Sequence, residues 1–224
     1  MLFICAVLSS VSPTIYAQDP AANPLSSVAC RYEVINTKAQ QKASKQVWHF
    51  WRDANMIQTL ESDGDVGEIW QQTATGHIQY RKFYPQDKTA IEYMPADKPT
   101  NHLDFNWGKL SQMISAEELQ SLKVIKKISV HGKEAEWRKG SVNGKDLEVK
   151  WLLADNLPAS IVRKDKQGRL ELRLLDISTM ATAKQKPLSI AELAEYRHID
   201  AVDFGDMESD PFVKKILAAE GHHH

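Results

Sequence analysis

The side chains that most often carry catalysis or bind metals are scattered through this 224-residue chain without a recognisable spacing. No two of the histidines before the last three residues are separated like zinc ligands, and the chain contains no HExxH, P-loop, GxSxG or GxGxxG motif. The acidic run from Asp200 to Asp210 lacks the spacing of an EF-hand calcium loop. We therefore expect no enzymatic activity, no metal and no cofactor. The histidines considered, which exclude the C-terminal His222, His223 and His224, are His49, His77, His102, His131 and His198.

Aromatic side chains, by contrast, recur at a spacing that could build an apolar binding wall. Trp48 and Phe50 alternate with His49 and Trp51, so a strand here carries aromatic rings on both of its faces. Either the sheet is covered on both sides, or one face lines a cavity. The alternative to a cavity is a small barrel that the same side chains fill. We predict a cavity with this wall: Trp48, Phe50, Trp70, Tyr80 and Tyr93.

A short helical segment could close such a cavity. The apolar residues Trp107, Leu110, Met113 and Ile114 recur at helical spacing, and a helix carrying them must bury that stripe. Laid across the mouth of the cavity, Leu110, Met113 and Ile114 would act as a lid, and the flexible methionine suits an adaptable contact. Packing on the outer face of the sheet is the alternative.

The elements that must position these residues are short strands joined by tight turns. Between Cys30 and Met94, runs rich in aromatic and β-branched residues are separated by Asp, Asn, Gly and Pro, which predicts an antiparallel meander. The predicted strands of this first half are Cys30–Ile35, Gln46–Arg52, Met56–Glu61, Val66–Thr73, His77–Tyr84 and Thr89–Met94.

Strands resume after the helical segment, and the tail is helical. Ser115 and Glu118 form a capping box for a second short helix that ends near Leu122. Asn143-Gly144 is a strong signal for a type I′ turn. A further capping box begins at Ser189, and Asp210-Pro211 starts a last helix. The predicted strands here are Lys123–Val130, Glu134–Val142, Lys145–Leu153, Ala159–Lys164 and Arg169–Ile177.

The ends of the chain indicate export. Residues 2–17 are uncharged and end in a small residue, which is typical of a cleavable signal peptide; a buried N-terminal helix is the alternative. Residues 18–29 are predicted to be a flexible leader, residues 30–220 one domain, and residues 221–224 a tail that resembles a truncated purification tag. A net charge of −1 gives no basic surface for nucleic acid. We expect a periplasmic protein.

One cysteine would remain after signal cleavage. Cys30 follows Ser27-Val28-Ala29, which faintly resembles a lipoprotein acylation site, but Ser27 stands where such a site has leucine. We interpret Cys30 as a small buried residue at the start of a strand.

The order of these elements resembles the bacterial outer-membrane lipoprotein carrier and receptor superfamily, the Lol-like proteins. The similarity is strongest in Glu148–Arg163, where a strand ending in Trp-Leu-Leu, a Leu-Pro bend and a strand beginning Ile-Val follow one another; the charged turn Asp165–Gly168 comes next. It covers roughly Gln46 to Ile177. The resemblance implies an incomplete, strongly curved antiparallel β barrel with short helices as its lid and an interior that takes acyl chains.

Our leading hypothesis is therefore an exported binding protein of mainly β (α+β) class. Its ligand would be a lipid, an acyl chain or the anchor of an acylated protein, and its role would be transport towards the outer membrane. A periplasmic protein-interaction or sensor module on the same fold, with another envelope protein as partner and no small ligand, is the alternative. An exposed apolar patch at Trp51 or Trp137 would favour that module. A hydrolase would need a convergent Ser/His/Asp or paired-carboxylate site.

Overall fold

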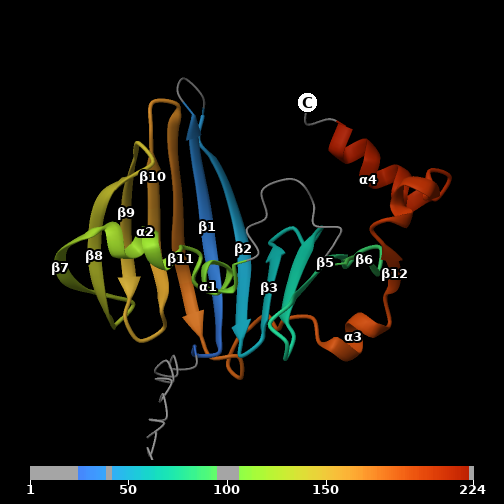
Figure 1. The fold of residues 1–224 in the computed structure, drawn as a ribbon, viewed down its shortest axis with the longest axis horizontal. Coiled ribbons are helices and arrows are strands. Elements are labelled where there is room, and N and C mark those ends of the chain that lie inside the picture. The colour runs from blue at the N-terminus through green and yellow to red at the C-terminus, as the bar shows by residue number, and fades with distance from the viewer. Residues whose placement is uncertain (1–24, 39–41, 95–105, 222–224) are drawn as a thin grey trace, which may run out of the picture.

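A single curved sheet organises the molecule. The computed structural model describes residues 25–38, 42–94 and 106–221, and their strands form one 12-stranded sheet. The sheet is open, with β12 at one edge and β7 at the other (Figure 1). This confirms the predicted mainly β fold with a strongly curved antiparallel sheet and short helices. The strand order is β12-β6-β5-β4-β3-β2-β1-β11-β10-β9-β8-β7.

The first half of the chain folds as the predicted meander. Each of its six strands pairs antiparallel with the next, because turns of two to five residues leave no room for a crossover. The first strand begins at Val28, slightly before the predicted start at Cys30. The bounds are β1 (Val28–Lys38), β2 (Ser44–Asp53), β3 (Met56–Glu61), β4 (Gly67–Gln72), β5 (Ile78–Tyr84) and β6 (Thr89–Tyr93).

A second meander forms the other half of the sheet. Asn143 and Gly144 both have positive φ, 51° and 75°, as the predicted type I′ turn requires. The last strand of this meander pairs antiparallel with β1, with Tyr32 opposite Leu174, and thereby joins the two halves. The bounds are β7 (Lys123–Val130), β8 (Lys133–Val142), β9 (Lys145–Leu152), β10 (Leu157–Lys164) and β11 (Gly168–Ser178).

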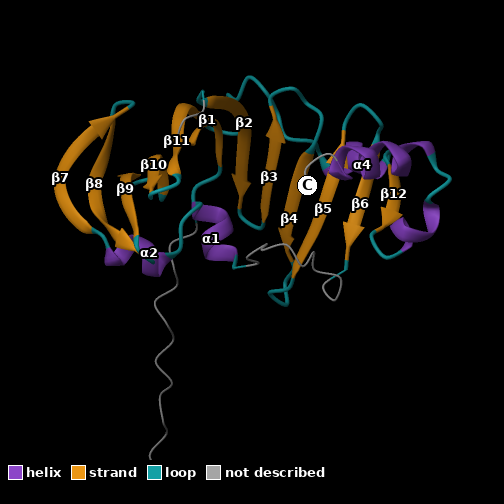
Figure 2. Ribbon diagram, turned by 90° about the horizontal axis from the view of Figure 1, so that it is seen from above, coloured by secondary structure: helices purple, strands orange, loops and turns teal. Residues whose placement is uncertain are grey.

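Short helices α1 (Trp107–Gln112) and α2 (Ala116–Ser121) lie on the same side of the sheet, beneath its arch (Figure 2). We call this side the inner face. Helix α1 ends where Met113 adopts a left-handed conformation with φ 62°. The periodicity predicts Met113 and Ile114 within the helix, whereas both residues lie just after its end. The capping box at Ser115 is present at the start of α2.

The C-terminal segment covers the β5, β6 and β12 end of the sheet. Helix α3 (Ile190–Ala194) begins at the predicted capping box and packs Leu193 on the outer face. A 3-10 helix, η1 (Asp203–Met207), leads to α4 (Pro211–Gly221), whose Phe212, Val213 and Ile216 pack on the inner face. None of the described helices is long and apolar enough to cross a membrane.

Strand β12 (Arg197–Asp200) is absent from the predicted elements. It pairs parallel with β6, and Ile199 lies opposite Ile91. This strand has only four residues, and Ile199 is the single apolar one, so the sequence shows no alternation that would predict a strand. The strand forms because the chain returns alongside β6 and pairs with it.

The segment that follows β11 covers the outer face of the sheet centre. The outer-face ring of Trp51 is only 2% exposed, and its Nε1–H donates to the carbonyl of Gln185 at 3.1 Å. Ala183 packs against the same ring. The segment that follows β11 therefore explains why β2 carries aromatic residues on both faces: one set packs under this segment, and the other faces the inner side.

Candidate functional site

An aromatic wall rises from strands β1 and β2 on the inner face. The Trp48 ring stacks on Tyr32 with centroids 5.6 Å apart and meets Phe50 edge-on at 6.1 Å. The Tyr32 hydroxyl donates to the carbonyl of Pro158 at 2.9 Å, which ties this wall to β10. Burial, the largest cause, raises the pKa of Tyr32 well above its usual value, so the hydroxyl stays a donor.

A second aromatic wall rises from strands β4, β5 and β6. Trp70 stacks on Tyr80 at 5.4 Å, and Tyr80 contacts Tyr93 at 5.0 Å. The Tyr80 hydroxyl donates to Glu68 Oε1 at 2.5 Å. Desolvation by burial and the neighbouring Glu68 charge raise the pKa of Tyr80, so this bond keeps the carboxylate in place at neutral pH.

Strand β3 forms the floor between the two walls. Its residue Ile57 lies opposite Trp70 on β4, and Thr59 lies opposite Phe50 on β2. Both floor residues are much smaller than the indole and phenyl rings on either side. The inner face therefore contains a groove along β3 with aromatic walls, and we call it the β3 groove.

One end of the β3 groove lies under helix α1. This apolar end is a cavity of about 270 Å³. Apart from Thr59 and the side chain of Lys109, it is lined by aromatic and aliphatic groups, with Leu110 and Met113 supplied by the α1 segment. The full lining is Trp48, Phe50, Ile57, Thr59, Trp70, Lys109, Leu110 and Met113.

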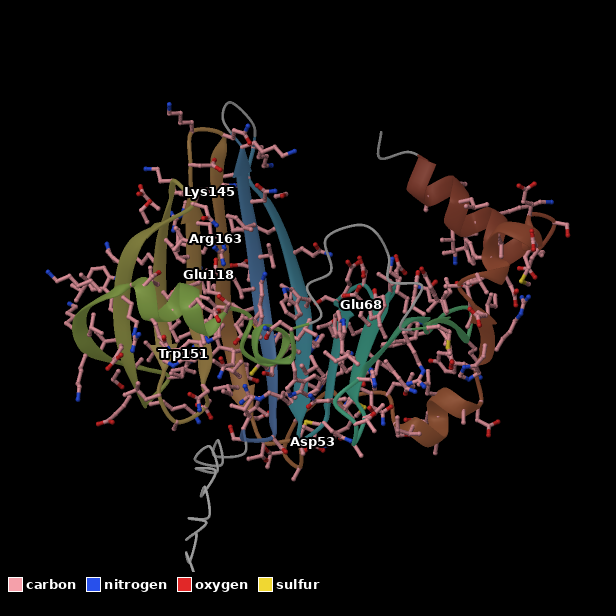
Figure 3. All side chains as sticks on the ribbon, in the orientation of Figure 1. Asp53, Glu68, Glu118, Lys145, Trp151 and Arg163 are labelled. Carbon is pink, nitrogen blue, oxygen red and sulfur yellow. The ribbon has the colours of Figure 1, made fainter. Side chains whose placement is uncertain are left out.

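The other end of the β3 groove carries more polar side chains than the apolar end, and we call it the polar end. Here a cavity of about 500 Å³ shares Trp48, Thr59 and Trp70 with the apolar end, and Val34, Leu60 and Val66 also line it. Burial raises the pKa of Glu61, and neighbouring carboxylates add to the effect. Glu68, held by Tyr80, lies on β4 at the same end (Figure 3). The polar lining residues are Gln46, Thr59, Glu61, Glu68 and Lys82.

The predicted wall residues all lie on the inner face. Trp48, Phe50 and Trp70 line the apolar end of the groove directly. Tyr80 stands behind Trp70, and Tyr93 stands behind Tyr80, where it also contacts the α4 cluster. The alternation of strand residues thus predicts which side chains share a face of the sheet. It does not predict which of them line the groove and which, like Tyr80 and Tyr93, pack behind the lining residues.

The predicted lid residues divide between two places. Leu110 and Met113 lie over the apolar end of the groove, on the inner face and not on the outer face that the alternative foresaw. Ile114 is fully buried in another cluster, with Leu122 of the α2 segment and Val149 of β9. The left-handed turn at Met113 directs the chain away from the groove before Ile114. Ile114 therefore anchors the segment and does not line either groove cavity.

Arg52 holds the α1 segment in place, and sequence reasoning missed it. The Arg52 side chain is fully buried, and its guanidinium donates to carbonyls from three separate parts of the chain. A charge this deep requires such a set of acceptors. The carbonyls are those of Ser26 at 3.0 Å, Ser111 of α1 at 2.8 Å, Asp155 at 2.5 Å and Asn156 at 3.3 Å.

Helix α2 is held by an ion pair to the sheet. Arg163 of β10 donates to both carboxylate oxygens of Glu118, at 2.8 and 3.3 Å (Figure 3). The same Glu118 completes the capping box with Ser115. The segment that carries the lid residues is therefore fixed at both helices, which favours a preformed groove.

The described side chains that could have served other chemistry do not converge on one site. Within the described ranges, no three His, Cys, Asp or Glu side chains come together as metal ligands. His49 stacks on Trp51 on the outer face, and His198 contacts Glu92 at 2.8 Å. Cys30 lies in β1 and is buried as predicted, and desolvation raises its pKa to about 12.

A further cavity of about 560 Å³ lies on the outer face, next to Trp51. Its rim carries Arg31, Asp176 and Lys184, charges of both signs on exposed residues. Because this hollow has one aromatic wall and a mixed polar rim, the apolar end of the β3 groove is the better candidate for an apolar ligand.

Comparison with known proteins gives no match by sequence. No protein-family model and no curated protein matches the chain. Solved structures show partial similarity, and three of them illustrate the range.

The first of these structures is a domain named as an outer-membrane lipoprotein-sorting protein from Vibrio parahaemolyticus, with 11% identity, a TM-score of 0.34, and coverage of 71% of this chain and 88% of that one. A LolA superfamily protein from Nitrosomonas europaea has 11% identity and a TM-score of 0.30, with coverage of 73% and 89%. MucB in its complex with MucA from Pseudomonas aeruginosa has 15% identity and a TM-score of 0.37, with coverage of 77% and 58%.

The superfamily that the sequence resembles thus recurs among the structural neighbours. At this level of similarity, the matches concern the arrangement of strands alone. The site defines a class by its own geometry: an open-sheet protein with a preformed, two-ended groove on its inner face.

Proposed function

We propose that this protein binds the acyl chain of a lipid or of an acylated protein in the β3 groove. The observation that carries the proposal is the groove itself, with an apolar end under α1 and a polar end at Glu61 and Glu68. An amphiphile has the same division. Its chain would lie between Trp48 and Trp70, and its head group would remain at the polar end.

Burial of the chain would supply the binding free energy. Each buried methylene contributes about 0.8 kcal/mol, which is roughly a fourfold gain in affinity. Affinity should therefore rise about fourfold per added methylene until the apolar end is full. A surface that merely adsorbs hydrocarbon would give no such limit.

The same proposal includes a location and a role. Residues 2–17, which lie outside the described residues, have the composition of a signal peptide, and we propose export to the periplasm. A periplasmic protein with an acyl-binding groove could shield a lipid or lipoprotein anchor from water on its way to the outer membrane.

The alternative, a module that binds another envelope protein, lacks the patches expected for it. Trp51 is covered by the segment after β11. Trp137 lies between Lys126 and Lys139 and donates to Glu148 at 2.7 Å. Among the described residues, neighbouring apolar side chains are exposed on edge strand β7, at Val124 and Ile125. A peptide that pairs with β7 would be the expected mode of such a partner.

Direct analysis of bound lipid tests the proposal. The protein would be purified from its own periplasm, measured by native mass spectrometry, and extracted with organic solvent. We expect a stoichiometric lipid or acylated species. A protein that is empty and also fails to take up a fluorescent fatty acid would contradict the proposal and favour the interaction module.

A charge placed in the apolar end should abolish uptake. Met113→Glu puts a carboxylate into a cavity lined by Trp48 and Trp70, so fluorescent fatty-acid binding should fall at least tenfold. Met94→Glu is the matched control, because Met94 is 55% exposed and lines neither groove cavity. Circular dichroism should show both variants folded. Equal binding by both variants would place the ligand elsewhere.

A further inference from the structure

The indole of Trp70 carries a buried hydrogen-bond donor to which no described residue offers an acceptor. Trp70 is 5% exposed, and its Nε1–H has no hydrogen-bond partner within residues 25–38, 42–94 and 106–221. Two other buried or half-buried tryptophans show the ordinary arrangement: Trp51 donates to the Gln185 carbonyl, and Trp137 donates to Glu148. A buried N–H that has lost its water without gaining a partner destabilises the folded protein.

The described neighbours of Trp70 supply no acceptor for its N–H. One side of the ring stacks on Tyr80, whose hydroxyl is already committed to Glu68. Across the sheet, Ile57 lies opposite Trp70 and has no polar side-chain atom. The same indole lines both cavities of the β3 groove, at the junction of the apolar and polar ends.

We infer that the β3 groove selects amphiphiles that carry an ester or amide carbonyl at the head of the alkyl chain, and that the Trp70 Nε1–H donates to this carbonyl oxygen. The inference rests on the proposed acyl-binding function. It narrows the ligand from any hydrocarbon chain to an acyl ester or acyl amide. In such molecules the carbonyl stands where chain and head group join, which is the place that Trp70 occupies in the groove.

Ligand pairs that differ only at the carbonyl test this directly. Methyl dodecanoate and methyl dodecyl ether, in which a methylene replaces the carbonyl, would each compete with a fluorescent fatty acid. Wild-type protein should prefer the ester by about three- to tenfold, the usual gain from one hydrogen bond. In Trp70→Phe, which keeps an aromatic ring against Tyr80 but lacks the donor, the preference should fall to one or below.

Trp48→Phe is the matched control on the facing wall. It removes aromatic area from the same two cavities, so both ligands should bind more weakly by a similar factor. The ester preference should remain. A preference that persists in Trp70→Phe, or one that is lost equally in Trp48→Phe, would overturn the assignment of the donor.

Other outcomes separate this inference from the proposed function. If both ligands compete equally in wild-type protein, the carbonyl inference is wrong and acyl binding stands. If neither ligand competes, acyl binding itself fails. Should Trp70→Phe not fold, the Trp70 indole N–H resonance of 15N-labelled wild-type protein gives the answer. It should shift downfield on adding the ester and not on adding the ether, and the absence of that difference would overturn the inference.

Discussion

At the scale of single residues, Arg52 connects parts of the chain that no strand pairing joins. Its guanidinium bonds the carbonyl of Ser111 in α1 and also those of Ser26 and Asp155. The groove therefore depends on a charged group that never touches it. No pattern in the sequence separates this arginine from those at the surface, because its acceptors are backbone atoms brought together by the fold.

Arg52→Met should destabilise the protein strongly. The substitution keeps the apolar stem but leaves several buried carbonyls without a donor, so the free energy of unfolding should fall by about 3 kcal/mol or more. Urea denaturation followed by tryptophan fluorescence measures this. Arg169→Met, at an exposed ion pair with Glu171, is the control and should cost less than about 1 kcal/mol. Similar losses in both variants would contradict the role given to Arg52.

Cys30 should make stability depend on alkaline pH. Its pKa is about 12 in the folded protein against an ordinary value of 9.0, so above pH 9 the unfolded chain loses a proton that the folded protein keeps. Stability from this group is present below pH 9 and is lost as pH rises towards 12. The wild-type free energy of unfolding, relative to Cys30→Ala, should fall by roughly 1.4 kcal/mol per unit between pH 9.5 and 11. Parallel pH curves for the two proteins would argue against a buried thiol.

At the scale of elements, the sequence predicts the strands and the starts of helices, whereas it does not predict the floor of the groove. The alternation of Trp48 and Phe50 with their neighbours predicts a strand and a shared face. Capping boxes at Ser115 and Ser189 predict where two helices begin. The groove floor at Ile57 and Thr59 could not be predicted, because its importance lies in being smaller than the rings on neighbouring strands. Recognising it requires the register of β2, β3 and β4.

Strand β12 and helix α4 should depend on one buried residue. Val213 is fully buried against the cluster of Tyr84, Ile91 and Ile199, so Val213→Ala should lower the free energy of unfolding by about 2 kcal/mol. Leu217, on the same helix but 44% exposed, is the control, and Leu217→Ala should stay within about 0.5 kcal/mol. Thermal denaturation of the three proteins measures the difference. Equal effects would mean that α4 is not docked as described.

At the scale of the whole molecule, the sheet is open and its edges need protection. Strand β7 is mostly exposed, with Val124 and Ile125 among its outward residues. Lys123, Lys126 and Lys127 lie on the same strand, and charged side chains on an edge strand oppose pairing with another molecule. We therefore expect these lysines to oppose pairing of the open edge with a second copy.

Removing this protection should cause self-association. The double substitution Lys126→Val and Lys127→Val leaves a long, apolar, uncharged stretch at the edge, so light scattering should show oligomers at concentrations where the wild type remains unchanged. Lys166→Val, in the exposed turn between β10 and β11, is the control and should have no such effect. Monomeric behaviour of the double variant would mean that the edge is protected by other means.

The pairing of β1 with β11 also determines when the molecule can fold. Tyr32 and Leu174, which lie opposite each other at the centre of the sheet, are separated by most of the chain. Contacts of such long sequence separation make folding slow, because the intervening chain must first be brought together. A chain that becomes available for folding from its N-terminus onwards therefore presents the aromatic strands β2 to β5 long before β11 can pair with β1. During that interval the surface that later forms the groove is accessible to a chaperone.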